Sequence, residues 1–154
     1  MKWAPHVTVA CLAEREGRFL VVEESTPDGL RINQPAGHLE DGESLVDAMV
    51  REALEETAHH VVPEALVGIY RWRHPTHGHT YLRFAFAARI DRVEPGRALD
   101  EGIVRALWVT PDELRASADR HRSPLVLTCL EDHLSGRRFP LDLLCDFPLT
   151  EEHR

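Results

Sequence analysis

Three glutamates that lie close together in the chain, Glu52, Glu55 and Glu56, are the residues best suited to chemistry. On a helix their side chains share an arc of roughly 100°, since each residue turns the chain by about 100°. Like charges at spacings of three and four residues destabilise a bare helix. Mg²⁺ and Mn²⁺ prefer oxygen ligands, so a hard divalent cation would offset this repulsion. The spacing favours a metal-binding helix face, with a solvated acidic face without function as the alternative.

The residues around these glutamates support the metal-binding interpretation. The same helix has a stripe of residues that would face the core, namely Val46, Met49, Val50, Ala53 and Thr57. The glutamates border this stripe. Upstream, a turn is predicted at Pro35-Ala36-Gly37, followed by Asp41-Gly42-Glu43. This loop could bring a backbone carbonyl to the same metal.

Three helices have recognisable first residues. Each predicted start places a hydroxyl cap next to the helix: Ser44 before Leu45, Thr110 before Pro111, and Ser123 before Pro124. Gly136 is a predicted stop for the last of these helices.

Strands are predicted between these helices. Their compositions and period-2 alternation point to the segments 6–13, 18–24, 66–73, 80–90 and 103–109. No linker or repeat divides the chain, so residues 1–154 are expected to form a single domain. The expected fold is a mixed sheet with a few helices, an α+β or α/β sandwich.

The composition narrows the function classes. The 154 residues are 43% hydrophobic and 29% charged, which is typical of a globular protein. Lys and Arg number 18 against 26 Asp and Glu, a net charge of −8, which argues against a nucleic-acid-binding role. No apolar run approaches the ~18 residues of a membrane span, and the first residues lack the pattern of a signal peptide. Three widely spaced cysteines, Cys11, Cys129 and Cys145, are expected to be reduced core residues of a cytoplasmic protein.

The acidic segment resembles a known motif. Gly37, five residues, Glu43, seven residues and then Arg51-Glu52-Ala53-Leu54-Glu55-Glu56 are similar to the Nudix box, the loop–helix–loop signature of Nudix hydrolases. The resemblance implies an α/β/α sandwich with a mixed sheet. The sequence departs from the motif at its end, where Ala58 replaces the usual glycine of the helix C-cap. His59 and His60 would then lie in the last helical turn, favourable to the helix dipole when protonated.

The resemblance also implies roles for the residues of the box. Glu52, Glu55 and Glu56, together with the Gly37 carbonyl, would hold Mg²⁺, with Mn²⁺ as a substitute. The metal would bridge diphosphate oxygens and lower the pKa of a bound water. Arg51 is expected to point away from this arc and to tie down the loop through Glu43. Non-catalytic Nudix-like modules that only bind a nucleotide usually lack a box carboxylate; all are present here, which favours an enzyme.

Segments outside the box resemble the NudJ-type phosphatases of that superfamily: residues 5–11, 19–24, 33–40, 122–126 and 136–142. This similarity implies hydrolysis of small phosphorylated metabolites by attack of water at phosphorus. The implied substrates are hydroxymethylpyrimidine diphosphate, thiamine diphosphate and nucleoside tri- and diphosphates, with release of orthophosphate. A monomer is expected.

Residues outside the box could contact the substrate. Asn33 and Gln34 precede the box, and Arg71 and His74 border a loop between two strands. A solvated loop is the alternative for the last two. The pattern His74-x-x-His77-x-His79 could in principle hold zinc, although no cysteine supports such a site.

Two aromatic residues and one acidic pair leave alternatives open. Trp72 and Trp108 could stack on a ring, although tryptophans in strands are more often core residues. Glu101 is expected to supply a further metal ligand or the general base. Asp100 would then point the opposite way, because side chains alternate in an extended segment. A surface turn is the alternative for this pair, with Glu55 as the base.

Overall fold

The computed structural model describes residues 2–148 and shows seven strands in the order β3-β2-β1-β6-β5, with β4 on β1 and β7 on β2. Their bounds are β1 His6–Arg15, β2 Arg18–Thr26, β3 Gly29–Asn33, β4 Ala36–His38, β5 His59–Arg73, β6 Thr80–Val93 and β7 Ile103–Val109. β1 and β6 pair in parallel, whereas the other pairs are antiparallel. The expectation of a mixed sheet is therefore confirmed.

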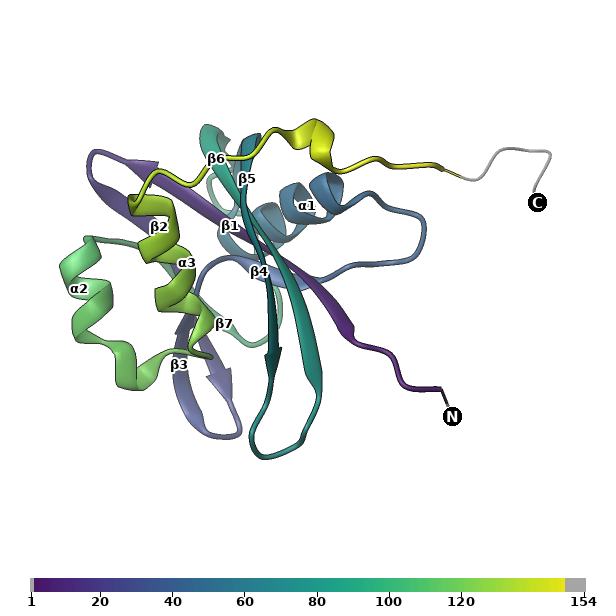
Figure 1. Cartoon of the computed structure of the whole chain (residues 1–154). Coiled ribbons are helices and arrows are strands. Elements are labelled where there is room, and N and C mark those ends of the chain that lie inside the picture. The colour runs from purple at the N-terminus through teal and green to yellow at the C-terminus, as the bar shows by residue number, and fades with distance from the viewer. Residues whose placement is uncertain (1, 149–154) are drawn as a thin grey trace.

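Alternate residues of β1 enter two different cores. Ala10 and Leu12 belong to one apolar cluster, which also holds residues of α2 (Pro111–Ala116) and α3 (Leu125–Leu134). Val9 and Cys11 belong to the other cluster, which contains residues of α1 (Leu45–Thr57). Figure 1 shows α1 on one side of the sheet and α2 and α3 on the other. The fold is thus the expected three-layer sandwich, with both faces of β1 buried.

The helix starts follow the capping pattern at all three predicted positions. Ser44 Oγ accepts a hydrogen bond from the Asp47 N–H at 3.1 Å, and Thr110 Oγ1 accepts one from the Glu113 N–H at 3.1 Å. Before α3, Ser123 Oγ accepts a hydrogen bond from the Leu125 N–H at 3.1 Å, and Pro124 between them already has helical backbone angles, φ −59° and ψ −20°. The α3 helix ends at Leu134, just before Gly136. Among the described residues, no helix is long and apolar enough to cross a membrane.

The strands extend further than the sequence patterns predict, and two were missed. β3 was not predicted at all, and residues 35–37, expected as a turn, lead into and form most of β4. β5 begins at His59, so the expectation that His59 and His60 close the helix is wrong. Ala58 adopts the left-handed conformation at φ 59°, which ends α1 and sends the chain into β5.

The cysteines only partly match the expectation of core residues. Cys11 and Cys129 are buried and unpaired, whereas Cys145 is exposed. Burial raises the pKa of the Cys11 thiol to about 12, so it behaves as an inert apolar residue.

Ala58→Gly is expected to raise the free energy of unfolding by about 0.5–1 kcal/mol, because glycine adopts the left-handed cap without steric strain. Urea denaturation of the metal-free protein measures the change. Ser135→Gly is the matched control, since Ser135 caps α3 at φ −74° and glycine relieves no strain there. Equal effects of the two substitutions would show that Ala58 stores no strain.

Candidate functional site

The acidic face of α1 is turned toward β4, and part of it is buried. Glu52 and Glu56 are each only 8% exposed, so they lie within the buried face of the helix and not merely beside it. A Cβ atom built on Gly37 would lie 2.2 Å from the Glu52 carboxylate. The glycine is therefore required because any side chain at this position of β4 would displace Glu52.

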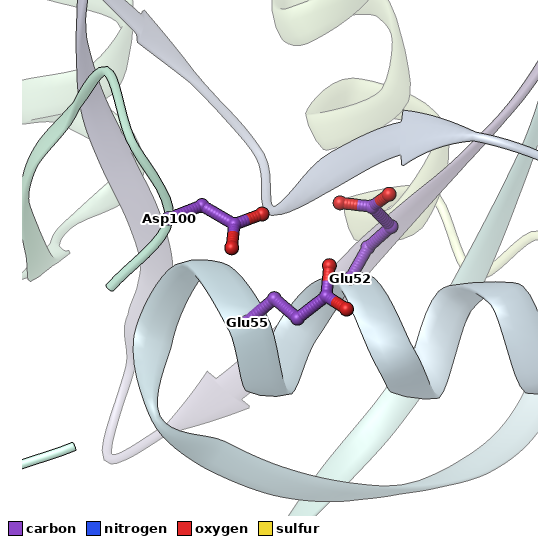
Figure 2. A group of neighbouring side chains, drawn as sticks. All are labelled: Glu52, Glu55 and Asp100. Atoms are coloured by element: carbon purple, nitrogen blue, oxygen red, sulfur yellow. The ribbon is translucent and has the colours of Figure 1, made fainter. Parts of the chain in front are cut away.

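Three carboxylates converge beside α1. Oxygens of Glu52, Glu55 and Asp100 all lie within 4.8 Å of one another, the first two from the helix and the third from the loop before β7 (Figure 2). The Asp100 N–H donates to the Glu55 carbonyl at 3.0 Å, which holds this loop against α1. An all-oxygen set of this kind suits a hard divalent cation. In the part of the chain that the structure describes, this is the one group whose ligand atoms converge in this way.

The orientation expected for the Asp100-Glu101 pair is reversed. Asp100 joins the two helix glutamates, while Glu101 is exposed and lies outside the group. The segment is a turn, in which the Ile103 N–H donates to the Asp100 carbonyl at 3.1 Å and Gly102 has φ 90°. Strand alternation does not apply to such a turn, and this is why the prediction failed.

Glu56 lies apart from the three converging carboxylates. Its Oε1 atom accepts a hydrogen bond from the Ala36 N–H at 2.9 Å. Burial raises the pKa of Glu56 to about 9, and the nearby charges of Glu24, Glu52 and Asp100 act in the same direction. Burial also raises the pKa of Glu52 to about 7, although Arg51 opposes the shift. Both carboxyl groups lack sufficient positive charge nearby, which fits a site for a cation.

Arg51 links the loop to the acidic residues. Its guanidinium holds both oxygens of Glu43, at 2.8 and 3.0 Å, so the expected pair is confirmed. The same guanidinium also donates to Glu52 at 2.9 Å and to Glu55 at 3.1 Å. The expectation that Arg51 points away from the acidic arc is therefore wrong. Arg51 lowers the pKa of Glu43 and supplies the positive charge nearest to the carboxylates.

A cavity of about 810 Å³ opens beside the acidic residues. Gly37, Glu52 and Glu56 contribute to its lining. Its wall also includes Trp72 and Tyr81, whose rings stack with centroids 5.9 Å apart. The cavity thus combines oxygen ligands with a flat aromatic surface.

The residues predicted to contact substrate divide into two groups. Asn33 and His74 line the cavity. Gln34 is buried and does not line it, and its Nε2 donates to the Val126 carbonyl at 2.8 Å. Arg71 is exposed and also lies outside the lining, since it alternates with Trp72 along β5.

Arg83 lines the cavity and was missed by the sequence analysis. The available signal was its position in β6: it shares the strand face of Ala85 and Ala87, two buried core residues. A lone arginine at a core-facing position of a strand is unusual, and this position is the signal that points to a functional role.

The structure also bears on the possible zinc site of the three histidines and on the two tryptophans that could stack on a ring. His74 and His77 stack with ring centroids 3.7 Å apart, but with His79 they do not bring ligand atoms together for a metal within residues 2–148. Trp108 packs against the α1 core and under Arg15, at 4.4 Å from its ring centroid, and is not among the cavity residues. Of the two tryptophans considered for stacking, the cavity contains Trp72.

The chain is similar to known proteins in both sequence and structure. The family model described as "NUDIX domain" matches residues 3–129. The chain is 41% identical over 149 residues to Phosphatase NudJ of Escherichia coli K12, covering 96% of each chain. A solved structure of a NUDIX hydrolase from Nitrosomonas europaea is 50% identical, covers 94% of this chain and 98% of its own, and has a TM-score of 0.90. The structure of a UDP-X diphosphatase, 17% identical with a TM-score of 0.71 over 90% of this chain and 67% of its own, shares the fold.

The raised pKa values predict how the stability of the metal-free protein depends on pH. A carboxyl group whose pKa is raised on folding stabilises the fold at low pH, and this contribution is lost as the pH rises through the folded pKa. The free energy of unfolding should thus fall between about pH 4.5 and pH 9, through Glu52 and then Glu56. Glu56→Gln should remove at least about 1.4 kcal/mol of the fall between pH 6 and pH 9, the equivalent of one pKa unit.

Urea denaturation in the presence of a chelator at several pH values measures this fall. Glu64→Gln, an exposed substitution on β5, is the control and should keep the wild-type slope. Parallel pH profiles for wild type and Glu56→Gln would contradict the assignment.

Proposed function

The chain belongs to the NUDIX family, and we propose from this premise that it hydrolyses diphosphate linkages in small phosphorylated metabolites with a divalent metal ion. One observation carries the proposal: Glu52, Glu55 and Asp100 converge beside a cavity large enough for a nucleotide-sized ligand. Glu52 belongs both to this group and to the cavity lining, so a metal held by the group would lie next to the cavity, where a diphosphate could reach it.

We propose that Glu52, Glu55 and Asp100 hold Mg²⁺, with Mn²⁺ as a substitute. The Gly37 carbonyl and Glu56 are further candidate ligands at the same end of the cavity. When bound, such a metal neutralises phosphate oxygens and lowers the pKa of a coordinated water. The donor set fits the ion, since it consists of carboxylate oxygens, and burial raises the pKa values of Glu52 in the set and of Glu56 beside it.

The chain's own residues perform the remaining tasks. A carboxylate of Glu52 or Glu55 accepts the proton of the attacking water. Arg51 positions Glu52 and Glu55 and connects them to the loop through Glu43. In this proposal Asp100 takes the place that the sequence analysis assigned to Glu101.

The substrate range is proposed from the resemblance to NudJ-type phosphatases. It comprises hydroxymethylpyrimidine diphosphate, thiamine diphosphate and nucleoside tri- and diphosphates, with orthophosphate as the inorganic product. Trp72 and Tyr81 support a substrate with an aromatic ring, because they provide a flat surface for stacking. We further propose a monomeric enzyme of the cytoplasm; the unpaired Cys11 and Cys129 support the reducing compartment.

With Mg²⁺, purified protein should convert nucleoside triphosphates in successive steps that release orthophosphate, and it should hydrolyse hydroxymethylpyrimidine diphosphate at a comparable rate. A substrate panel in which orthophosphate and pyrophosphate are measured separately tests this. Pyrophosphate as the main product from ATP or GTP would contradict the NudJ-like activity. Nucleotide binding without any turnover would instead support a non-catalytic module.

Substitutions of neighbouring carboxylates test the metal assignment. Glu55→Gln should lower kcat by about 10³-fold or more and Asp100→Asn by about 10²-fold, because each removes a proposed metal ligand. Glu101→Gln is the matched control for Asp100→Asn and should change kcat by less than about threefold, since Glu101 is exposed outside the group. A large loss for Glu101→Gln with none for Asp100→Asn would restore the original orientation.

A further inference from the structure

Arg83 is a buried, charged residue that lines the cavity, and it has no role in the group of acidic residues. It lies on β6, is only 5% exposed and forms part of the cavity wall. Its neighbour on the same strand face, Tyr81, belongs to the aromatic wall. The guanidinium is thus placed where a ligand in the cavity can meet it.

The charge of Arg83 is not neutralised by a carboxylate within residues 2–148. Its two terminal nitrogens donate to neutral amide oxygens, to Gln34 Oε1 at 3.0 Å and to Asn33 Oδ1 at 2.9 Å. Glu24 is the acidic residue connected to it, but only through Asn33, whose Nδ2 donates to Glu24 at 3.4 Å. Arg122 already pairs with Glu24 at 3.1 Å. Burial of a cation without a directly paired anion is costly, and an anion in the cavity would compensate for it.

The amino end of α3 adds positive potential on the same side. Ser123 and Leu125, at the start of this ten-residue helix, line the cavity. Gln34 connects the two features, since it accepts from Arg83 and donates to the Val126 carbonyl in the first turn of α3. The Leu125 N–H already donates to Ser123 Oγ at 3.1 Å, so α3 contributes the positive end of its dipole to this wall and not this N–H group, and the dipole adds to the charge of Arg83 in favouring an anion.

This wall is separated from the acidic residues by the order of the strands. Thr8 of β1 pairs with His38 of β4 on one side and with Arg83 of β6 on the other. Adjacent strands are about 4.8 Å apart, so the backbones of β4 and β6 are separated by roughly 10 Å. A single phosphate bound at Glu52 and Glu55 would therefore leave the Arg83 wall free for another group of the same ligand.

We propose that Arg83 and the amino end of α3 form an anion subsite that binds a phosphate group of the substrate other than the one at the acidic residues. This proposal rests on the proposed diphosphate hydrolysis. The substrate class is then an organic di- or triphosphate whose phosphate groups are divided between the acidic residues and Arg83.

Metal-free binding of inorganic triphosphate, measured by isothermal titration calorimetry at low ionic strength, tests the subsite without turnover. Wild type should bind, and Arg83→Met should bind at least about tenfold more weakly, as expected for loss of a charge-assisted contact. Arg89→Met removes an exposed arginine from the same strand and should match wild type. Equal affinities of the Arg83 and Arg89 variants would overturn the proposal. Orthophosphate that binds Arg83 as tightly as triphosphate would also overturn it, by indicating a product site.

Two further measurements keep the test valid if the Arg83→Met variant misfolds, and they distinguish failure of the subsite from failure of the proposed function. The Arg83 Nε–H resonance of wild-type protein should shift during the triphosphate titration, and an unchanged resonance would contradict the subsite. In the Mg²⁺ assay, Arg83→Met should raise KM for nucleoside triphosphates more than it lowers kcat. Binding through Arg83 without hydrolysis by wild type would overturn the proposed function alone, whereas hydrolysis without metal-free binding would overturn the subsite alone.

Discussion

The burial of two carboxyl groups between α1 and β4 is the constraint on which the rest of the site depends. Glu52 and Glu56 fit there because Gly37 has no side chain and because the Ala36 N–H donates to Glu56. Withdrawal from water makes their ionised forms costly, so their pKa values rise. The fold therefore keeps a region of unfavourable electrostatics that a bound cation would relieve. Stability of the empty protein and affinity for metal are opposed at the same residues.

Arg51 reduces the electrostatic cost of burying Glu52 but does not cancel it, since the pKa of Glu52 stays raised. It contacts three carboxylates at once, Glu43, Glu52 and Glu55, and so connects the loop to the helix. Its pairing with Glu43 uses both oxygens of that side chain, which gives directional as well as electrostatic stabilisation. The loop is thus held in place by the same guanidinium that offsets charge on the helix.

Local signals predicted the parts of the structure that local interactions determine. The caps at Ser44 and Thr110 are hydrogen bonds between residues three apart, and the bounds of β7 follow from its own composition. β3 and β4 were missed because short strands of mixed polarity are defined by their partners. Asp100 was placed wrongly because its position depends on a hydrogen bond to Glu55, far away in the sequence. The role of Arg83 could not be predicted because it depends on contacts with Asn33 and Gln34 and on the position of α3, and all of these are distant in the sequence.

The central position of β1 has a consequence for how such a protein can change over time. The acidic residues belong to α1 and the loop before β7, whereas Trp72, Tyr81 and Arg83 belong to the β5–β6 hairpin on the other side of β1. The hairpin residues line one cavity together with Glu52, but none of them contributes an oxygen to the group of converging carboxylates. Under the proposed function, substitutions in the hairpin would therefore alter ligand recognition while the converging carboxylates are preserved. A scaffold with this arrangement would diversify what it recognises by drift in one hairpin, with the carboxylates on α1 and in the loop before β7 left in place.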